Sequence, residues 1–308
     1  MWFIYALITT LAWGTTDLFY KIGAEEEDSH SHLKTAIMVG LVMGTHAFYL
    51  LLTKNLNYNF YNIIVYLPVS LMYILSMTVG YYGIRYLEIS IASPIQNTSG
   101  AIVSILSFII LGQKMTTLST IGVIIICISV VALGVLEKKK QDEYELKYDK
   151  KYKIGFMAFL MPILYCIIDA LGTFFDAYYL DDFSKTPLIG TTEETFENIA
   201  NVSYELTFLI FAIVLLFYLT VVKKEKFVLK QQKSRLFASL FETFGQSTYV
   251  FAMSGHGIVA APMIAAYSIV SVILSRIFIK EKLTKSQYFV VAMVILGIII
   301  LGIAEGMS

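Results

Sequence analysis

The chain has 308 residues, of which 57% are hydrophobic and only 15% are charged, and its mean hydropathy is +0.71. A water-soluble domain of this size rarely has such a composition, so it excludes an ordinary soluble enzyme and indicates a polytopic membrane protein. The net charge is zero and the lysines lie in short connectors between apolar stretches, so we expect no nucleic-acid binding.

Apolar stretches of about 20 residues, the length that crosses the hydrocarbon core as a helix, can be placed ten times in the sequence. We therefore predict an all-α membrane protein with ten transmembrane helices. The expected spans are 2–22, 33–53, 62–84, 88–111, 116–136, 154–178, 199–222, 234–254, 257–279 and 285–304. The first span has no basic leader and no small-residue cleavage site, so it is expected to remain as a permanent helix.

The first span carries Trp13, Asp17 and Tyr20, with Lys21 at its end. An ionisable group in the hydrocarbon layer costs about 2.5–3.5 kcal/mol, so one that is kept usually faces a partner, a cavity or a substrate path. Asp17 is therefore a candidate site residue between two aromatic walls. The alternative is that Lys21, four residues further along the helix, neutralises Asp17 and that the pair serves only the fold.

The connector after this span is acidic and contains His30 and His32. We expect a solvated turn, with weak metal capture as the alternative. In the second span, Gly40 and Gly44 have the spacing that lets helices approach closely. His46 follows them and is either a hydrogen-bonded packing residue or a proton relay.

The fourth span contains the polar run 93–100, which includes Pro94, Gln96 and Asn97. Proline removes a backbone hydrogen bond and bends a helix, and a membrane tolerates this only where protein or water satisfies the freed groups. Gln96 and Asn97 are thus candidates to line a polar cavity. Polar contact between helices is the alternative.

Basic residues divide the chain and predict its orientation. The segment 137–153 holds seven lysines and is expected to lie in the cytoplasm against the membrane lipid. It is the predicted linker between two five-helix halves, 1–136 and 154–308. Of the 23 Lys and Arg residues, 20 lie in or beside the connectors after spans one, three, five, seven and nine. By the positive-inside rule these connectors are cytoplasmic, so both termini are expected outside the cytoplasm of a cell-membrane protein.

Further candidates lie at helical spacing on single faces of later spans. They are Tyr165, Asp169 and Asp176 in the sixth span, Glu242, Gln246 and Tyr249 in the eighth, and Tyr267 in the ninth.

The sequence also contains an internal repeat. Residues 81–136 align with 249–304 at an offset of 168, without a gap, and a weaker match has an offset of 152. The aligned pairs include Tyr81 with Tyr249, Pro94 with Pro262, Thr116 with Thr284, Trp13 with Tyr165, and Asp17 with Asp169. Because each half has an odd number of spans, the halves would cross the membrane in opposite directions. Such inverted repeats build alternating-access transporters with a site between the halves.

The chain resembles the EamA branch of the drug/metabolite transporter superfamily. The resemblance lies in the two five-helix halves, in Trp13-Gly14 followed by Lys21, and in the turn 280–284 (Lys-Glu-Lys-Leu-Thr). The resemblance covers essentially the whole chain and implies secondary transport of amino acids, other metabolites, choline, sugars or related solutes. Two features depart from that pattern. The first half has Gln113 where the second has Glu281, and relatives are usually drawn with cytoplasmic termini, unlike the orientation that the lysines predict.

The predicted substrate-binding residues combine carboxylates, amides and aromatic rings. They are Trp13, Asp17, Tyr20, Gln96, Asn97, Tyr165, Asp169, Glu242, Gln246, Tyr249 and Tyr267. The ionisable groups expected within spans are these three carboxylates, Asp176 and His46, with no Arg or Lys deep in a span. Such a site suits a small cationic or zwitterionic solute, such as an amine, a choline-like compound or an amino acid, because each cation–π contact is worth about 0.5–2 kcal/mol.

Asp169 or Glu242 would couple transport to protons, since a carboxyl group removed from water can exchange a proton near neutral pH. An exchanger or uniporter for a sugar or other neutral metabolite is the alternative, and a membrane-embedded enzyme is a remote one. The chain has no His-Glu-x-x-His or Gly-x-Ser-x-Gly motif and no metal-ligand spacing, and its two cysteines lie in separate spans. We therefore expect no enzymatic activity, metal or cofactor, and the oligomeric state stays open.

Overall fold

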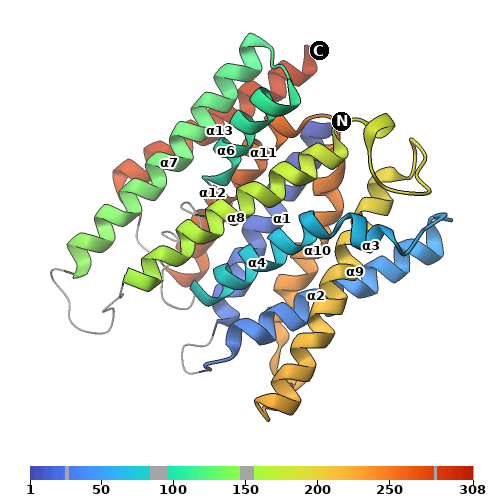
Figure 1. Ribbon diagram of the computed structural model, residues 1–308. Helices are drawn as coiled ribbons and strands as arrows, with labels where there is room; N and C mark the ends of the chain where they lie inside the picture. The colour runs from blue at the N-terminus through green and yellow to red at the C-terminus, as the bar shows by residue number, and fades with distance from the viewer. Residues whose placement is uncertain (25–27, 84–95, 97, 146–155, 281–282, 308) are drawn as a thin grey trace.

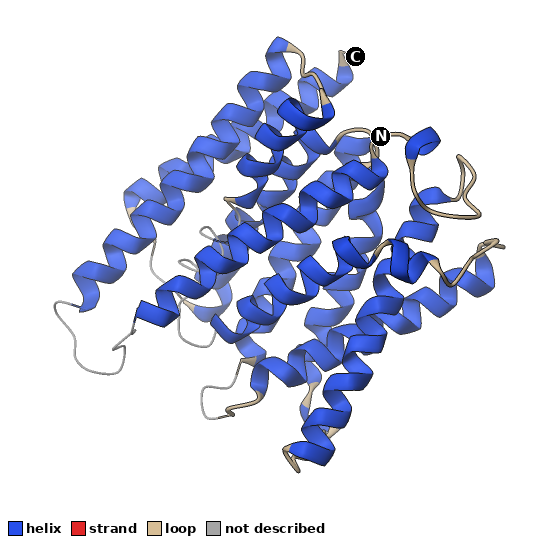
Figure 2. Ribbon diagram, in the orientation of Figure 1, coloured by secondary structure: helices blue, strands red, loops and turns tan. Residues whose placement is uncertain are grey.

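The computed structural model describes residues 1–24, 28–83, 96, 98–145, 156–280 and 283–307. Within these ranges the chain is helical, contains no strand, and forms one bundle of long helices lying side by side (Figures 1 and 2). Helices suit a membrane because they satisfy their own backbone hydrogen bonds. Pro94 and Asn97 of the predicted polar run lie outside the described residues.

The helices cover the predicted apolar stretches in the described part of the chain, and α7 continues beyond its predicted span into the charged segment 137–153. In the first half they are α1 (Trp2–Gly23), α2 (Ser31–Thr53), α3 (Asn62–Val65), α4 (Leu67–Gly83), α6 (Ser99–Leu106) and α7 (Thr117–Glu145). In the second half they are α8 (Phe156–Leu180), α9 (Phe196–Phe217), α10 (Lys233–Met253), α11 (Gly257–Ala265), α12 (Tyr267–Leu274) and α13 (Lys285–Gly306). Short 3₁₀ turns, η2 (Phe183–Lys185) and η4 (Leu229–Gln231), lie in the connectors before α9 and α10.

Within the described residues, five helical segments are long and apolar enough to cross a membrane. They are Ser31–Thr53, Ile163–Leu180, Phe196–Val222, Gly257–Ile279 and Lys285–Gly306, and the apolar helices Ser99–Leu111 and Thr117–Leu133 are shorter. The prediction of an all-α membrane protein is confirmed.

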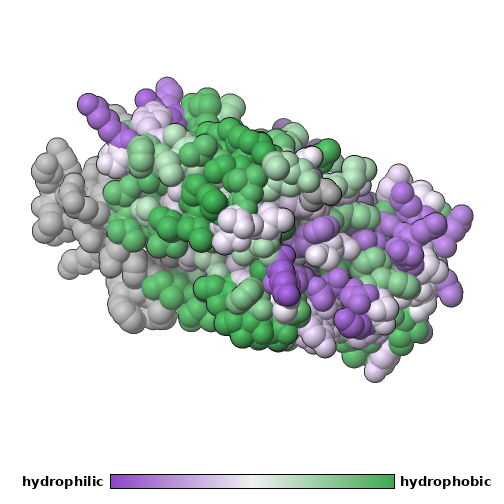
Figure 3. Space-filling view, turned by 90° about the horizontal axis from the view of Figure 1, so that it is seen from above, coloured by the Kyte–Doolittle hydropathy of each residue, from purple (hydrophilic) through white to green (hydrophobic). Residues whose placement is uncertain are grey.

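Large apolar side chains cover the outside of the bundle, among them Ile213 and Phe217 on α9 and Phe289 and Ile299 on α13. Seen from above, hydrophobic residues spread over the middle of the described surface and hydrophilic residues gather toward its right-hand end (Figure 3). Soluble monomers rarely expose apolar patches of this extent, so we assign this surface to the lipid.

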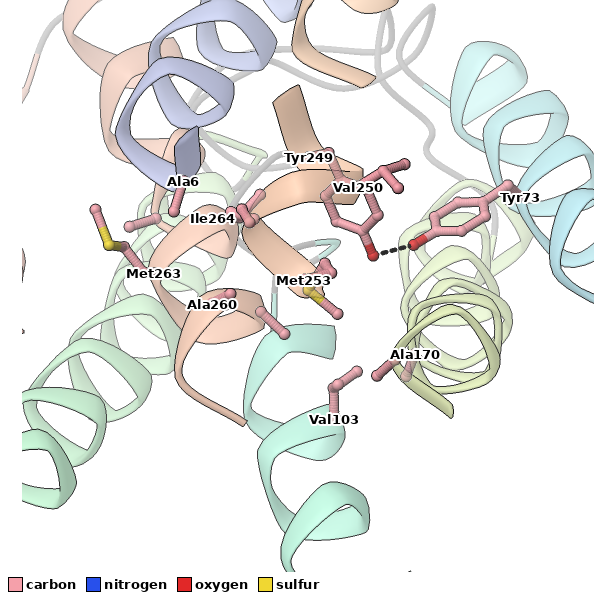
Figure 4. Packing of buried hydrophobic residues seen from close by; sticks show 14 of the residues in the cluster. Ala6, Tyr73, Val103, Ala170, Tyr249, Val250, Met253, Ala260, Met263 and Ile264 are labelled. Carbon is pink, nitrogen blue, oxygen red and sulfur yellow. Dashed lines mark hydrogen bonds between the residues drawn. The ribbon is translucent and has the colours of Figure 1, made fainter. Parts of the chain in front are cut away.

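Four helix pairs make the most extensive contacts: α1 with α10, α2 with α9, α4 with α8, and α7 with α13. Each pair joins a helix of the first half to one of the second, so the halves interleave rather than form separate lobes. The buried core also includes α6 and α11, through Val103 of α6 and Ala260 and Met263 of α11, and Val103 points toward Ala170 of α8 (Figure 4).

The predicted close approach at Gly40 is confirmed. A Cβ atom added at Gly40 would lie 2.3 Å from the carbonyl oxygen of Phe208 and 2.5 Å from Cβ of Ala212, both on α9. The α2–α9 contact therefore depends on the absence of a side chain at this position.

We expect Gly40→Ala to lower the melting temperature of the detergent-purified protein, because overpacking costs about 1–3 kcal/mol. Gly306→Ala is the matched control, since a Cβ atom there would have no neighbour within 4 Å. Equal melting temperatures for the two variants would contradict the close packing of α2 on α9.

Local structure repeats at the offset of 168. The helix α6 continues into the π-helical turn η1 (Ser107–Leu111), and α12 continues into the π-helical turn η5 (Ser275–Ile279). The residues that follow, Gly112 and Lys280, both have left-handed backbones, with φ of 67° and 64°. A third such turn, η3 (Tyr218–Val222), ends α9. Aligned residues thus adopt the same irregular structure in both halves.

The two ends of the bundle are closed by different ion pairs. The N-terminal amine lies 2.9 Å from Glu305, so both termini occupy one end (Figure 1). At the opposite end Lys34 Nζ lies 2.8 Å from Asp28 and 3.1 Å from Glu225, while Arg235 lies 3.9 Å from Asp28. This second cluster ties the start of α2 to the segment between α9 and α10.

Asp28→Asn should lower the melting temperature at neutral pH but have little effect near pH 3. Burial alone would raise the pKa of Asp28, but hydrogen bonds from Lys34 and the His30 backbone, with the charges of Lys34 and Arg235, lower it from 3.8. A lowered carboxyl pKa contributes stability above the ordinary value, and that stability is lost as the pH falls through the lowered value.

The check is the melting temperature of wild type and Asp28→Asn between about pH 3 and about pH 7, with the exposed Glu193→Gln as control. A difference that does not change with pH would argue against this charge cluster.

Candidate functional site

A cavity lies inside the bundle between helices of both halves. The space open to the centre of a water molecule measures about 60 Å³. Its walls come from α1, α4, α8, α9, α10 and α12, and from Gln96. The lining residues are Trp13, Asp17, Tyr20, Tyr73, Met77, Gly80, Tyr81, Gln96, Tyr165, Asp169, Thr173, Tyr204, Glu242 and Tyr267.

The structure brings most of the predicted site residues to this cavity. Those that line it are Trp13, Asp17, Tyr20, Gln96, Tyr165, Asp169, Glu242 and Tyr267. Tyr249 and Gln246 are 1% exposed and lie behind the wall, where Tyr249 stacks on Trp13. Asn97 lies outside the described residues.

Each of the three cavity carboxylates accepts a hydrogen bond from a hydroxyl group. Ser271 Oγ donates to Asp17 Oδ2 over 2.8 Å, and Ser99 Oγ donates to Asp169 Oδ2 over 2.8 Å. Tyr20 donates to Glu242 Oε2 over 3.4 Å. Glu242 is within electrostatic range of both Asp17 and Asp169. None of the described residues that line the cavity is Lys, Arg or His, so the lining is strongly acidic.

Aromatic rings form the rest of the wall. Trp13 stacks on Tyr249 with ring centroids 5.1 Å apart and meets the edge of Tyr267 at 5.9 Å. Its indole Nε1 donates to the backbone carbonyl of Glu242 over 3.3 Å. Tyr81 donates to the Tyr20 hydroxyl over 2.9 Å. These contacts hold the rings in place beside the carboxylates.

The position of Trp13 depends on a glycine of the facing helix. A Cβ atom at Gly245 of α10 would lie 2.4 Å from Cδ1 of the Trp13 ring. A Cβ atom at the next residue of the motif, Gly14, would lie 2.4 Å from Cβ of Val270 on α12. The Trp13-Gly14 pair therefore places an indole against α10 and brings α1 close to α12.

Three tyrosines of the lining, Tyr73, Tyr81 and Tyr204, were not predicted as site residues. On α4, residues 73, 77 and 81 recur every four positions, so they share one helical face with Gly80. That spacing is the signal that could have identified Tyr73 and Tyr81. Tyr204 lies between Ser203 and Glu205 in a stretch of mixed polarity, where no such pattern marks it.

Glu205 was also missed, although it is an acidic residue within the seventh predicted span. It is fully buried on α9, and His46 Nδ1 of α2 lies 2.7 Å from its carboxylate. His46 therefore has a hydrogen-bonding partner on the facing helix. The pair lies outside the cavity lining.

One group of described residues has the ligand atoms for a metal, all within 4.8 Å of one another: Asp28, His30 and Glu225. Lys34 lies between the two carboxylates, so their charge is already compensated by an ammonium group.

The apolar exterior, the interleaved helices and the family match that follows define a multi-pass membrane protein, with a cavity inside its bundle. The profile of the EamA-like transporter family matches residues 1–135 and 197–303. The chain therefore belongs to this family, a part of the drug/metabolite transporter superfamily. The family resemblance of the sequence is confirmed, and it indicates a membrane transporter rather than an enzyme.

Comparison with solved structures agrees with this assignment at the level of the fold, with 28 matching chains. One of them, a crystal structure of a protein, has a TM-score of 0.65 and 11% sequence identity and covers 99% of this chain and 98% of its own. At that identity it is evidence for the fold alone. A comparison with curated proteins finds no significant match.

Proposed function

We propose that this protein is a secondary-active transporter that carries a small organic cation or zwitterion across the cytoplasmic membrane by alternating access. Amines, choline-like compounds and amino acids are the substrate classes. Family membership supports the transport activity. The observation that carries the substrate class is the cavity lining, with three carboxylates, seven aromatic rings and no basic side chain among its described residues.

The carboxylates and the aromatic rings of the cavity lining both favour a cationic substrate. A substrate ammonium group would gain attraction from Asp169 and Glu242 and cation–π contacts with the surrounding rings. A phosphorylated solute would instead need Arg or Lys at hydrogen-bonding distance. The carboxylate of a zwitterion would have only neutral donors here, such as the Gln96 amide and the phenols.

The proposed architecture is ten transmembrane helices in two inverted repeats, with the termini outside. The matching turns after α6 and α12 support the duplication. The meeting of both termini at one end supports an even number of crossings. Tags on each terminus that are accessible from outside intact cells would support this orientation, and cytoplasmic tags would contradict it.

A thermal-shift screen of the purified protein tests the substrate class. The ligands are amines, quaternary ammonium compounds, amino acids, sugars and sugar phosphates, and each positive compound is then used for uptake in proteoliposomes. We expect stabilisation by ammonium compounds. Stabilisation by sugars alone would favour the neutral-solute exchanger or uniporter, in which Gln96 and the phenols bind hydroxyl groups. Chemical conversion of a ligand without flux would favour an enzyme.

A further inference from the structure

Asp176 is a buried carboxylate that does not line the cavity. It lies on α8, seven residues beyond Asp169, and has no exposed surface. Tyr66 donates a hydrogen bond to its Oδ1 atom, whereas Oδ2 has no hydrogen-bond partner in the described part of the chain. Ionisable groups inside a membrane are costly and usually functional, so a half-satisfied carboxyl group needs an explanation.

A chain of hydroxyl groups leads from the cavity toward Asp176. Thr173 and Tyr73 line the cavity, and their oxygen atoms are 2.8 Å apart. The Tyr73 hydroxyl is in turn 2.7 Å from the Tyr249 hydroxyl (Figure 4). Tyr249 lies within electrostatic range of Asp176. A hydroxyl group both donates and accepts, so such a chain can pass a proton on.

The ionisable groups within electrostatic range of Asp176, among the described residues, are phenols. They are Tyr66 before α4, Tyr73 on α4, Tyr204 on α9 and Tyr249 on α10. The described residues provide no ion pair for Asp176. A lasting negative charge would therefore lack a counter-ion, whereas a protonated carboxyl group could donate its hydrogen to a phenol oxygen.

We propose that Asp176 is a second proton-binding residue of this transporter, reached from the cavity through Tyr73 and Tyr249. The inference rests on the proposed transport function and on the proton coupling that the sequence predicts for Asp169 or Glu242. In one transfer a protonated Asp169 gives up a proton to the cavity end of the chain, and Asp176 gains one from Tyr249. Each tyrosine donates one proton and accepts one, so only the two carboxyl groups change charge.

A second pair of hydrogen-bonded tyrosines leads to a carboxylate of the cavity lining. Tyr81, which the repeat aligns with Tyr249, donates to Tyr20, and Tyr20 donates to Glu242. Asp176 and Glu242 are therefore both buried carboxylates with two hydrogen-bonded tyrosines near them. Asp176 is the member of this pair of carboxylates that has no direct access to the solute.

Infrared difference spectroscopy of the full chain in lipid, titrated from about pH 5 to about pH 9, tests this without a substrate. Asp176→Asn should remove one carboxylic C=O band that changes with pH. Tyr249→Phe should keep the band but slow its hydrogen–deuterium exchange about tenfold, because the hydroxyl chain is broken. Glu205→Gln, the matched control, removes a buried carboxyl group elsewhere and should leave that exchange rate unchanged.

Two results would overturn the inference: identical titrating bands in Asp176→Asn and wild type, or an unchanged exchange rate in Tyr249→Phe. The second variant keeps the shape of the wild-type core, so it remains informative if Asp176→Asn does not fold. If the thermal-shift screen finds no ammonium compound that binds, this contradicts the proposed substrate class but leaves the assignment of the titrating band to Asp176 intact. Transport of a cation without that band would contradict this inference alone.

Discussion

Glu242→Gln should weaken binding of an ammonium substrate about 10- to 100-fold. A hydrogen bond or contact to a charged group contributes about 1.5–3 kcal/mol, and about 1.4 kcal/mol corresponds to a factor of ten in affinity. The glutamine keeps the shape of the side chain and can still accept the hydrogen bond from Tyr20. The loss therefore reports the charge rather than the packing.

The measurement is the dissociation constant of the ammonium ligand identified by thermal shift, together with its initial uptake rate in proteoliposomes. Asp169→Asn is expected to reduce binding to the same extent and to remove the dependence of uptake on pH. Glu205→Gln is the matched control, because Glu205 is buried to the same degree but lies outside the cavity lining. Wild-type transport in both cavity variants would remove these carboxylates from the mechanism.

Trp13→Ala should have the second large effect, a loss of about tenfold in affinity for an organic cation. The indole supplies a cation–π face worth about 0.5–2 kcal/mol. Its removal also leaves a gap between Tyr249 and Tyr267, which it contacts on two sides. Trp13→Phe keeps an aromatic face and should recover most of the affinity.

Fluorescence provides a direct measurement, because Trp13 is one of only two tryptophans in the chain. In a Trp2→Phe background the remaining emission comes from Trp13 alone and should change as the ligand fills the cavity. Trp2 contacts Glu305 outside the cavity, so Trp2→Phe should bind the ligand as wild type does. An emission that is constant through a saturating titration would argue against Trp13 as part of the binding site.

Apolar length and helical spacing predicted much of this structure. The long helices coincide with the apolar stretches because a chain in lipid must satisfy its backbone hydrogen bonds locally. The offset of 168 placed Ser107 opposite Ser275, and each begins the same π-helical turn. Polar residues on apolar helices also gave most of the cavity wall, since the membrane keeps few such residues without a use.

The sequence by itself thus determined the helices, the family and the types of side chain at the site. Only the tertiary structure decided which helix faces meet. It places Asp17, Asp169 and Glu242 around one cavity, but turns Tyr249 behind Trp13 and pairs His46 with Glu205. Helical spacing specifies which residues share a face, whereas the neighbour of that face depends on packing between distant segments, such as the approach of α1 to α10 over Gly245.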